Sequence, residues 1–223
     1  MHYGKSVVCV GLLVATGLGT PAARAAEPYV PLRWHVTAGF SQPAGSTGDL
    51  LQGGGYAVGG GFSFSPARGG PFDVRVDFAY ADNRATHQLI DAGQQQTSYE
   101  IDDGRGTFTS LTVNGVYRIP LGSGVRAYGI AGVGVYHSDL SLTQRVLVGG
   151  TYCDFYWGYC YPGVAGGDLV VASDATTRFG WNAGLGVEFP LYYGQAWFIE
   201  ARFNRIETAR PIEYVPITVG FRF

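Results

Sequence analysis

Apolar and polar residues alternate one by one in eight segments of the chain, which is the period of a β-strand with two unlike faces. The clearest segment is the last, residues 214–223, where one face is wholly apolar: Val215, Ile217, Val219, Phe221 and Phe223. The pattern predicts seven further strands, over residues 32–42, 54–65, 72–82, 107–119, 125–137, 176–189 and 196–205.

An apolar strand face needs a cover, and the sequence holds no second apolar layer that could supply one. Lipid is such a cover, and strands can cross a bilayer only as a closed barrel, because every backbone polar group must be paired there. The eight segments therefore predict an all-β fold, an eight-stranded antiparallel up-and-down transmembrane β-barrel. In the fifth segment, where glycines blur the alternation, we place Val133 and Val135 outward and Tyr128 and Tyr136 inward.

Three of the connections are short, and each begins with a proline, Pro66, Pro120 or Pro190, and contains glycine. Proline ends strand pairing and glycine permits a tight reversal. Residues 83–105 and 138–174 are expected to form long loops. In bacterial barrels the short turns face the periplasm and the long loops face outward, so both termini are expected in the periplasm.

The first residues have the features of a secretory signal peptide. Lys5 precedes a short apolar run over residues 7–18, and Ala23-Arg24-Ala25 fits a small-residue cleavage site. We expect residues 1–25 to be removed and residues 26–223 to form the barrel domain. The full chain has a formal net charge of −2, and loss of Lys5 and Arg24 makes it two units more negative. This balance argues against nucleic acid as a partner.

The final strand, with its terminal Phe, resembles the C-terminal strand of bacterial outer-membrane barrels. The chain as a whole resembles the OmpA/OmpX-type outer-membrane β-barrel family. The resemblance implies that Phe221 and Phe223 form a signal for the barrel-assembly machinery, and that outer-membrane lipid and lipopolysaccharide surround the protein.

The composition of 35 Gly, 15 Tyr and 13 Phe suits twisted strands with aromatic girdles at the two membrane interfaces. The periplasmic girdle is expected to contain Tyr117, Phe189, Tyr192, Tyr193, Trp197, Phe221 and Phe223. The outer girdle is expected to contain Tyr80, Phe179, Phe203 and Tyr214.

The inward face carries charges of both signs, and an eight-stranded barrel is just wide enough for side chains to fill. Buried charges must pair, so we expect an interior charge network. Its expected members are Asp73, Arg75, Asp77, Arg118, Arg126, Glu188, Glu200 and Arg202, with Arg222 also facing inward. Asp73, Arg118, Arg126 and Glu188 lie near the short turns and are expected to form one group. The alternative is a narrow channel lined by the same charges.

Cys153 and Cys160 remain after removal of the signal peptide, and an even pair in an exported chain predicts a disulfide. The bond would close an aromatic loop that holds Phe155, Tyr156, Trp157 and Tyr159. These rings are candidates for contact with an extracellular ligand, or else pack on other loops or the membrane interface. A metal site at the two cysteines is the weaker alternative, because no His lies nearby.

The best candidate for chemistry is His137-Ser138-Asp139, at the end of the fifth segment. In an extended strand His137 and Asp139 share one face while Ser138 points to the other, so the nucleophile and its base are separated. We therefore expect no catalytic residues, no cofactor and no metal.

The sequence thus predicts an integral protein of the bacterial outer membrane with a structural or surface-interaction, adhesin-like role. A narrow passive channel is the first alternative. An outer-membrane enzyme that modifies lipid A is the second.

Overall fold

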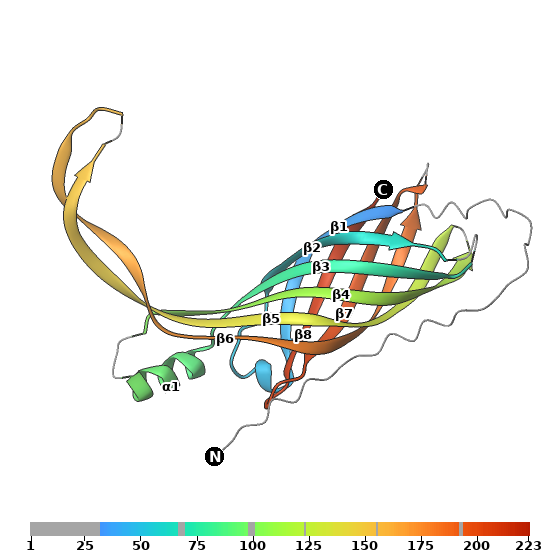
Figure 1. The fold of residues 1–223 in the computed structure, drawn as a ribbon, viewed down its shortest axis with the longest axis horizontal. Coiled ribbons are helices and arrows are strands. Elements are labelled where there is room, and N and C mark those ends of the chain that lie inside the picture. The colour runs from blue at the N-terminus through green and yellow to red at the C-terminus, as the bar shows by residue number, and fades with distance from the viewer. Residues whose placement is uncertain (1–31, 67–69, 98–100, 123, 155, 192–193) are drawn as a thin grey trace, which may run out of the picture.

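The chain folds into a closed antiparallel barrel in which each strand pairs with its two neighbours in sequence and β1 pairs with β8 (Figure 1). The computed structural model describes residues 32–66, 70–97, 101–122, 124–154, 156–191 and 194–223. The expected signal peptide lies outside the described residues. Among those residues no helix is long and apolar enough to cross a membrane.

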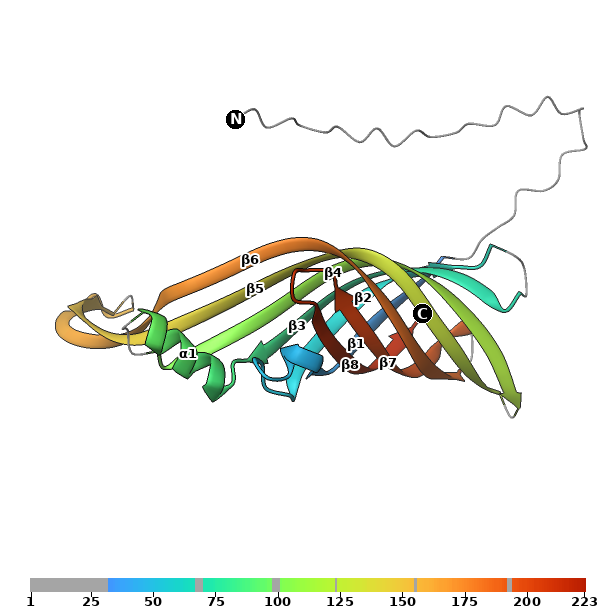
Figure 2. The same ribbon diagram turned by 90° about the horizontal axis from the view of Figure 1, so that it is seen from below.

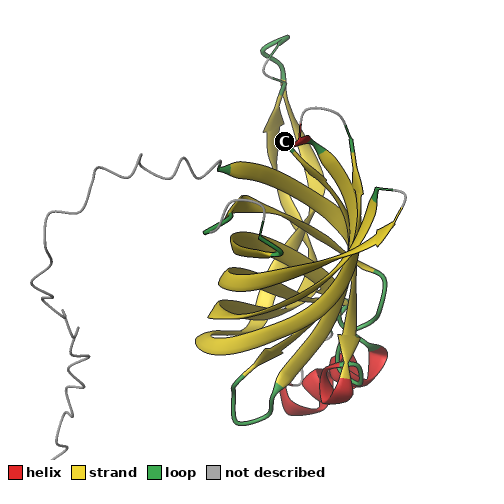
Figure 3. Ribbon diagram, turned by 90° about the vertical axis from the view of Figure 1, so that its right-hand side faces the viewer, coloured by secondary structure: helices red, strands yellow, loops and turns green. Residues whose placement is uncertain are grey.

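The strands that the structure describes are β1 (Arg33–Ala44), β2 (Gly55–Phe64), β3 (Phe72–Arg84), β4 (Asp103–Gly122), β5 (Val125–Cys153), β6 (Cys160–Pro190), β7 (Ala196–Ile206) and β8 (Ile212–Arg222). The prediction of an eight-stranded barrel is confirmed. The short connections from β2 to β3, from β4 to β5 and from β6 to β7 lie at one end, which we call the turn end (Figure 3). The opposite end, where β5 and β6 continue outward, is the arm end.

The outer face of the barrel is apolar, as the alternation predicts. Phe40, Leu111, Val133 and Leu185 are between 56% and 73% exposed, because nothing in the described part of the chain covers them. Their neighbours in sequence point inward. In β5 the expected phase is confirmed, since Tyr128 and Tyr136 are buried while Val133 and Val135 are exposed.

The seam between β1 and β8 closes the barrel. It runs from His35 opposite Arg222 to Ala44 opposite Glu213. At its turn end, the Trp34 N–H donates to the Phe223 carbonyl at 3.0 Å and the Phe223 N–H donates back at 2.9 Å. The closing strand pair therefore satisfies the backbone of both edge strands, as a lipid environment requires.

The prediction of a long loop over residues 138–174 is wrong. β5 and β6 continue as a paired hairpin to Cys153 and Cys160, far beyond the last β4–β5 pair at Asp103 and Thr143. We call residues 144–169 the arm. A register shift between Leu142 and Thr143 marks its base, and Figure 2 shows it extending past the barrel (Figure 2).

The expected polar loop over residues 83–105 is also wrong in part, because it contains helix α1 (His87–Thr97). Thr86 begins the helix, and its hydroxyl accepts a hydrogen bond from the Leu89 N–H at 3.4 Å. A short 3-10 turn, η1 (Gly45–Thr47), follows β1 directly.

Helix α1 lies against the base of the arm. Gly93 faces Ile101 and Leu142 so closely that a Cβ there would lie 2.8 and 2.9 Å from their methyl groups. The Gln94 side-chain amide donates to the Ile101 carbonyl at 3.0 Å. These contacts support the strand from which the arm departs.

Candidate functional site

The barrel interior is filled in layers, and its middle layer is a cluster of four charged side chains. Arg75 and Asp77 come from β3, and Glu200 and Arg202 come from β7; we call them the central cluster. Arg75 donates to both oxygens of Glu200, at 2.9 and 3.1 Å, and to Asp77 at 2.8 Å. Arg202 donates to Glu200 at 2.6 Å and to Asp77 at 3.2 Å. Two cations and two anions therefore neutralise one another where water is excluded.

Neutral partners complete the central cluster. His35 Nε2 lies 2.7 Å from Asp77 Oδ1, and the Asn114 amide donates to the other oxygen at 2.6 Å. The Tyr128 hydroxyl donates to Glu200 at 2.8 Å. The sequence pattern does not assign these three residues to the network. Their inward position follows from strand alternation, but the partner of an inward polar residue depends on register across the barrel.

A second group, the turn-end cluster, is centred on Glu188 of β6. Arg222 donates to its two oxygens at 2.5 and 2.9 Å, and Arg126 lies 2.7 Å away. Arg118 contacts Glu188 at 3.4 Å and also pairs with Asp73. The structure thus brings Asp73, Arg118, Arg126 and Glu188 into one group, separate from the central cluster.

The third layer is apolar and lies at the arm end; we call it the apolar plug. Its buried members are Leu51, Ala57, Ala81, Phe108, Tyr136, Ile206 and Tyr214. The expected position of Tyr214 in the outer girdle is wrong: the residue is 3% exposed and stacks on Phe108 with ring centroids 4.7 Å apart. Its even position in β8 puts it on the inward face. Tyr192 and Tyr193 of the expected periplasmic girdle lie outside the described residues.

Little space remains among these layers. Beside the central cluster a cavity of about 40 Å³ is present, and beside the turn-end cluster one of about 10 Å³. Spaces of this size hold no more than a few water molecules. The described interior is therefore packed with side chains.

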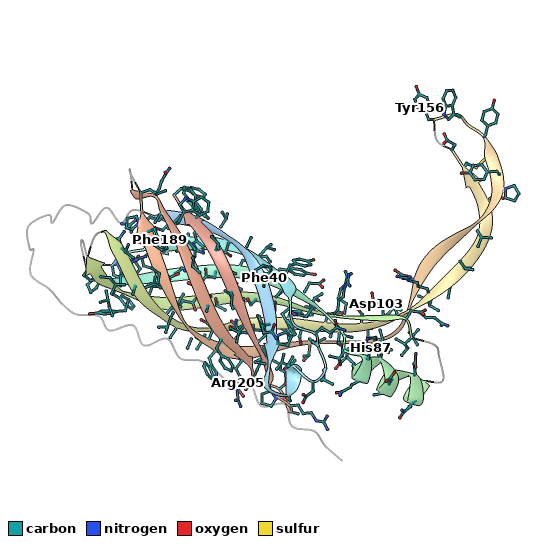
Figure 4. All side chains as sticks on the ribbon, turned by 180° about the vertical axis from the view of Figure 1, so that it is seen from behind. Phe40, His87, Asp103, Tyr156, Phe189 and Arg205 are labelled. Atoms are coloured by element: carbon teal, nitrogen blue, oxygen red, sulfur yellow. A yellow bond between two sulfur atoms is a disulfide. The ribbon has the colours of Figure 1, made fainter. Side chains whose placement is uncertain are left out.

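The tip of the arm carries the exposed rings. Cys153 and Cys160 form a disulfide with a Cα–Cα distance of 4.0 Å. Tyr156, Trp157 and Tyr159 are 84%, 69% and 73% exposed. Phe155, the fourth candidate ring, lies outside the described residues. Figure 4 places Tyr156 at the far end of the arm, with His87 and Asp103 near its base and Phe189 at the other end of the barrel (Figure 4).

One carboxylate organises this tip. Asp154 Oδ1 accepts hydrogen bonds from the Tyr156 and Trp157 N–H groups, both at 2.8 Å. The Gly158 N–H donates to the Asp154 carbonyl, and Gly158 has a φ of +68°, which glycine adopts without strain. An Asx turn followed by a left-handed glycine presents the rings outward.

His137, Ser138 and Asp139 do not assemble a catalytic group. His137 Nδ1 lies 2.9 Å from the Thr177 hydroxyl on the exposed face of the barrel wall. Ser138 is 7% exposed and faces the interior. The nucleophile and the base therefore lie on opposite sides of one strand.

Comparison with known proteins agrees with this architecture. The model of the family described as "Outer membrane protein beta-barrel domain" matches residues 10–222. The chain belongs to this family, whose members are proteins of the bacterial outer membrane.

Among solved structures, Neisserial surface protein A is similar, with 13% identity and a TM-score of 0.54; the match covers 86% of this chain and 95% of that one. A major outer membrane protein from Thermus thermophilus also matches, with 13% identity, a TM-score of 0.50, and coverage of 86% and 99%. At these identities the likeness establishes the fold alone. No curated protein matches the chain.

Proposed function

We propose that the protein is a surface-interaction protein of the outer membrane, adhesin-like in role, whose contact site is the tip of the arm. The observation that supports this most strongly is the exposure of Tyr156, Trp157 and Tyr159 at the end of a hairpin that leaves the barrel. Large aromatic side chains supply most of the binding energy at many protein interfaces. A soluble surface rarely exposes several of them together without use.

The arm is built to hold these rings in place before a partner arrives. Its strands pair continuously from Gln144 opposite Leu169 to Cys153 opposite Cys160. The disulfide closes the end, and Asp154 fixes the turn. Because little ordering is left to be done on contact, binding costs less conformational entropy.

The charge of the arm indicates the chemistry of its partner. The charged side chains within residues 144–169 are Arg145, Asp154 and Asp168. A sulfated or phosphorylated partner would need clustered Arg or Lys side chains, which the arm does not offer. Aromatic faces without charge suit neutral sugars or apolar protein surfaces.

We infer the orientation from the same architecture. The short turns and both termini lie in the periplasm, residues 1–25 are removed on export, and the arm points away from the cell. Phe221 and Phe223 then meet the assembly machinery from the periplasmic side, and lipid and lipopolysaccharide surround the barrel. Proteinase K added to intact cells should cut within residues 141–174 and spare the short turns; cuts at the turns would invert the orientation.

A channel and an enzyme are less well supported. The layers of paired charges and apolar rings oppose a conducting path. The separation of His137 from Ser138 opposes hydrolysis of lipid A.

The function is tested with bacteria that display either the wild-type protein or a variant with Tyr156→Ser, Trp157→Ser and Tyr159→Ser. Attachment is measured to a panel of immobilised neutral glycans, sulfated glycans, extracellular matrix proteins and phosphatidylcholine bilayers. The proposal expects at least one surface to retain the wild type and lose the variant. A matched control replaces Phe179 of β6, on the outer barrel face, by Ser and should attach normally at equal surface expression. Equal attachment of all strains on every surface contradicts the proposal.

A further inference from the structure

A cavity of about 320 Å³ lies at the arm end of the barrel, above the apolar plug; we call it the mouth cavity. Six parts of the chain line it: the segment after β1, strands β4, β5 and β6, the connection between β7 and β8, and the first residue of β8. Its volume is in the range of sites that bind small molecules. It is several times larger than the spaces beside the two charged clusters.

The mouth cavity is closed at its inner end. Phe108 lines it, and the stacked pair of Phe108 and Tyr214 closes the barrel below. Leu51, 5% exposed, belongs to the same packed layer. A molecule that enters from the arm end therefore meets a packed floor, so the geometry fits binding and not passage.

Most of the wall surface is apolar, and the hydroxyl side chains that interrupt it are Ser46, Thr47, Ser138 and Thr176. Leu50, Leu51, Leu140 and Ile212 line the cavity together with the Phe108 ring. Ser138 also lines it, and its residue is only 7% exposed, so its hydroxyl is a polar group at the cavity wall. A molecule in the cavity that bears one polar group can form a hydrogen bond with this hydroxyl while its apolar part contacts the remaining wall.

The rim limits the charge that a ligand can carry. Asp49, Asp139 and Asp174 line the cavity, against one cation, Arg210. Asp49, Asp174 and Arg210 are exposed and Asp139 is partly exposed, and within the described residues none of the four forms an ion pair. The excess of carboxylates disfavours anions, and the apolar walls disfavour the desolvation of any full charge.

We propose that the mouth cavity binds a small, uncharged, mostly apolar molecule that carries one hydroxyl or carbonyl group, which hydrogen-bonds to Ser138. Alkylphenols and medium-chain alcohols have this chemistry. The site is independent of the arm tip: it uses the inward face at the barrel mouth, and neither the exposed rings nor the disulfide takes part.

The test uses 4-ethylphenol as the probe and the full protein, isotopically labelled, in lipid nanodiscs. Backbone NMR signals of Leu51, Phe108, Ser138 and Leu140 should shift and saturate as the probe is added. The Ser138→Ala variant should bind about tenfold more weakly, the ordinary effect of one lost hydrogen bond. Ser173→Ala, at an exposed serine of β6, is the matched control and should bind as the wild type does.

A second variant tests the volume directly. Leu140→Phe places a larger side chain in the same wall and should weaken binding while the barrel spectrum is retained. Shifts that never saturate, or that are as large at the lipid-facing residues Leu111 and Val133, would mean that the probe only partitions into the bilayer and would overturn the proposal. Unchanged affinity in Ser138→Ala would overturn the assigned hydrogen bond. Binding of 4-ethylbenzoate as tightly as 4-ethylphenol would overturn the assigned charge class.

Discussion

Arg75 of β3 and Glu200 of β7 meet in a two-point salt bridge, although their strands are four positions apart in either direction around the barrel. In an eight-stranded ring no two strands are farther apart. The pair therefore spans the interior and links opposite walls. Asp77 and Arg202 close the same ring of charges, so each cation contacts both anions.

Removing one charge from this ring should strongly destabilise the barrel. Glu200→Gln leaves two buried arginines with Asp77 alone, and an uncompensated buried charge costs about 3–5 kcal/mol. Urea-induced unfolding in lipid vesicles measures the loss. The matched control is Glu207→Gln, because Glu207 is half exposed and its contact with Arg205 is 3.3 Å long. That change should cost less than about 1 kcal/mol. Equal losses in the two variants would contradict a central role for the charge ring.

The wild-type protein should show no steady ion conductance in planar lipid bilayers. The spaces of about 40 and 10 Å³ beside the charged clusters hold only a few waters and do not join the floor of the mouth cavity into a path. A general diffusion porin in the same lipid serves as positive control. Reproducible ohmic steps from the purified protein would show that the layers open.

A glycine in β6 should be intolerant of a side chain because a ring lies against it. A Cβ on Gly186 would lie 2.3 Å from the Tyr128 ring, and that ring is held by the hydrogen bond to Glu200. Gly186→Ala should therefore destabilise the barrel by about 1–3 kcal/mol, as overpacking does. Gly129→Ala is the control, since the nearest atom to its Cβ is 4.0 Å away. Thermal unfolding followed by the shift in gel mobility compares the two; a stable Gly186→Ala variant would contradict the packing described.

Loss of the disulfide should loosen the tip and leave the barrel intact. In Cys153→Ser with Cys160→Ser, local order falls by on the order of 2–3 kcal/mol, the chain-entropy value for a short loop. Hydrogen exchange at residues 152–161 should speed up. The urea midpoint of the barrel should not move, because within the described residues the pairing of β5 with β4 ends at Thr143. A lowered midpoint would show that the arm supports the barrel.

The sequence predicts the strands well where lipid imposes the alternation. Leu111 and Val113 must face lipid while Thr112 must not, so period two is unavoidable there. Beyond the membrane this constraint ends: Leu147 and Val164 of the arm are exposed on a free hairpin, and their segments lack a regular alternation. The continuation of β5 and β6 therefore leaves no signal of a strand in the sequence pattern.

The site was predictable only in part for a related reason. Alternation puts Arg75 and Glu200 on the inward face, yet it does not say that they meet. Their contact depends on strand tilt and register summed around the ring. Helix α1 had one local signal, the capping position of Thr86, but its position follows from packing on Ile101 and Leu142, which no short pattern encodes.

The seam between β1 and β8 has a consequence for how the barrel folds. It joins segments separated by almost the whole described chain, so it can form only after the other strand pairs have arranged the two edges opposite each other. Until then both edges expose unpaired backbone groups, each costly in hydrocarbon. An incomplete barrel is therefore unstable in the bilayer. Once the seam is joined, β1 and β8 no longer have a free edge, and neither can leave until the seam parts along its whole length.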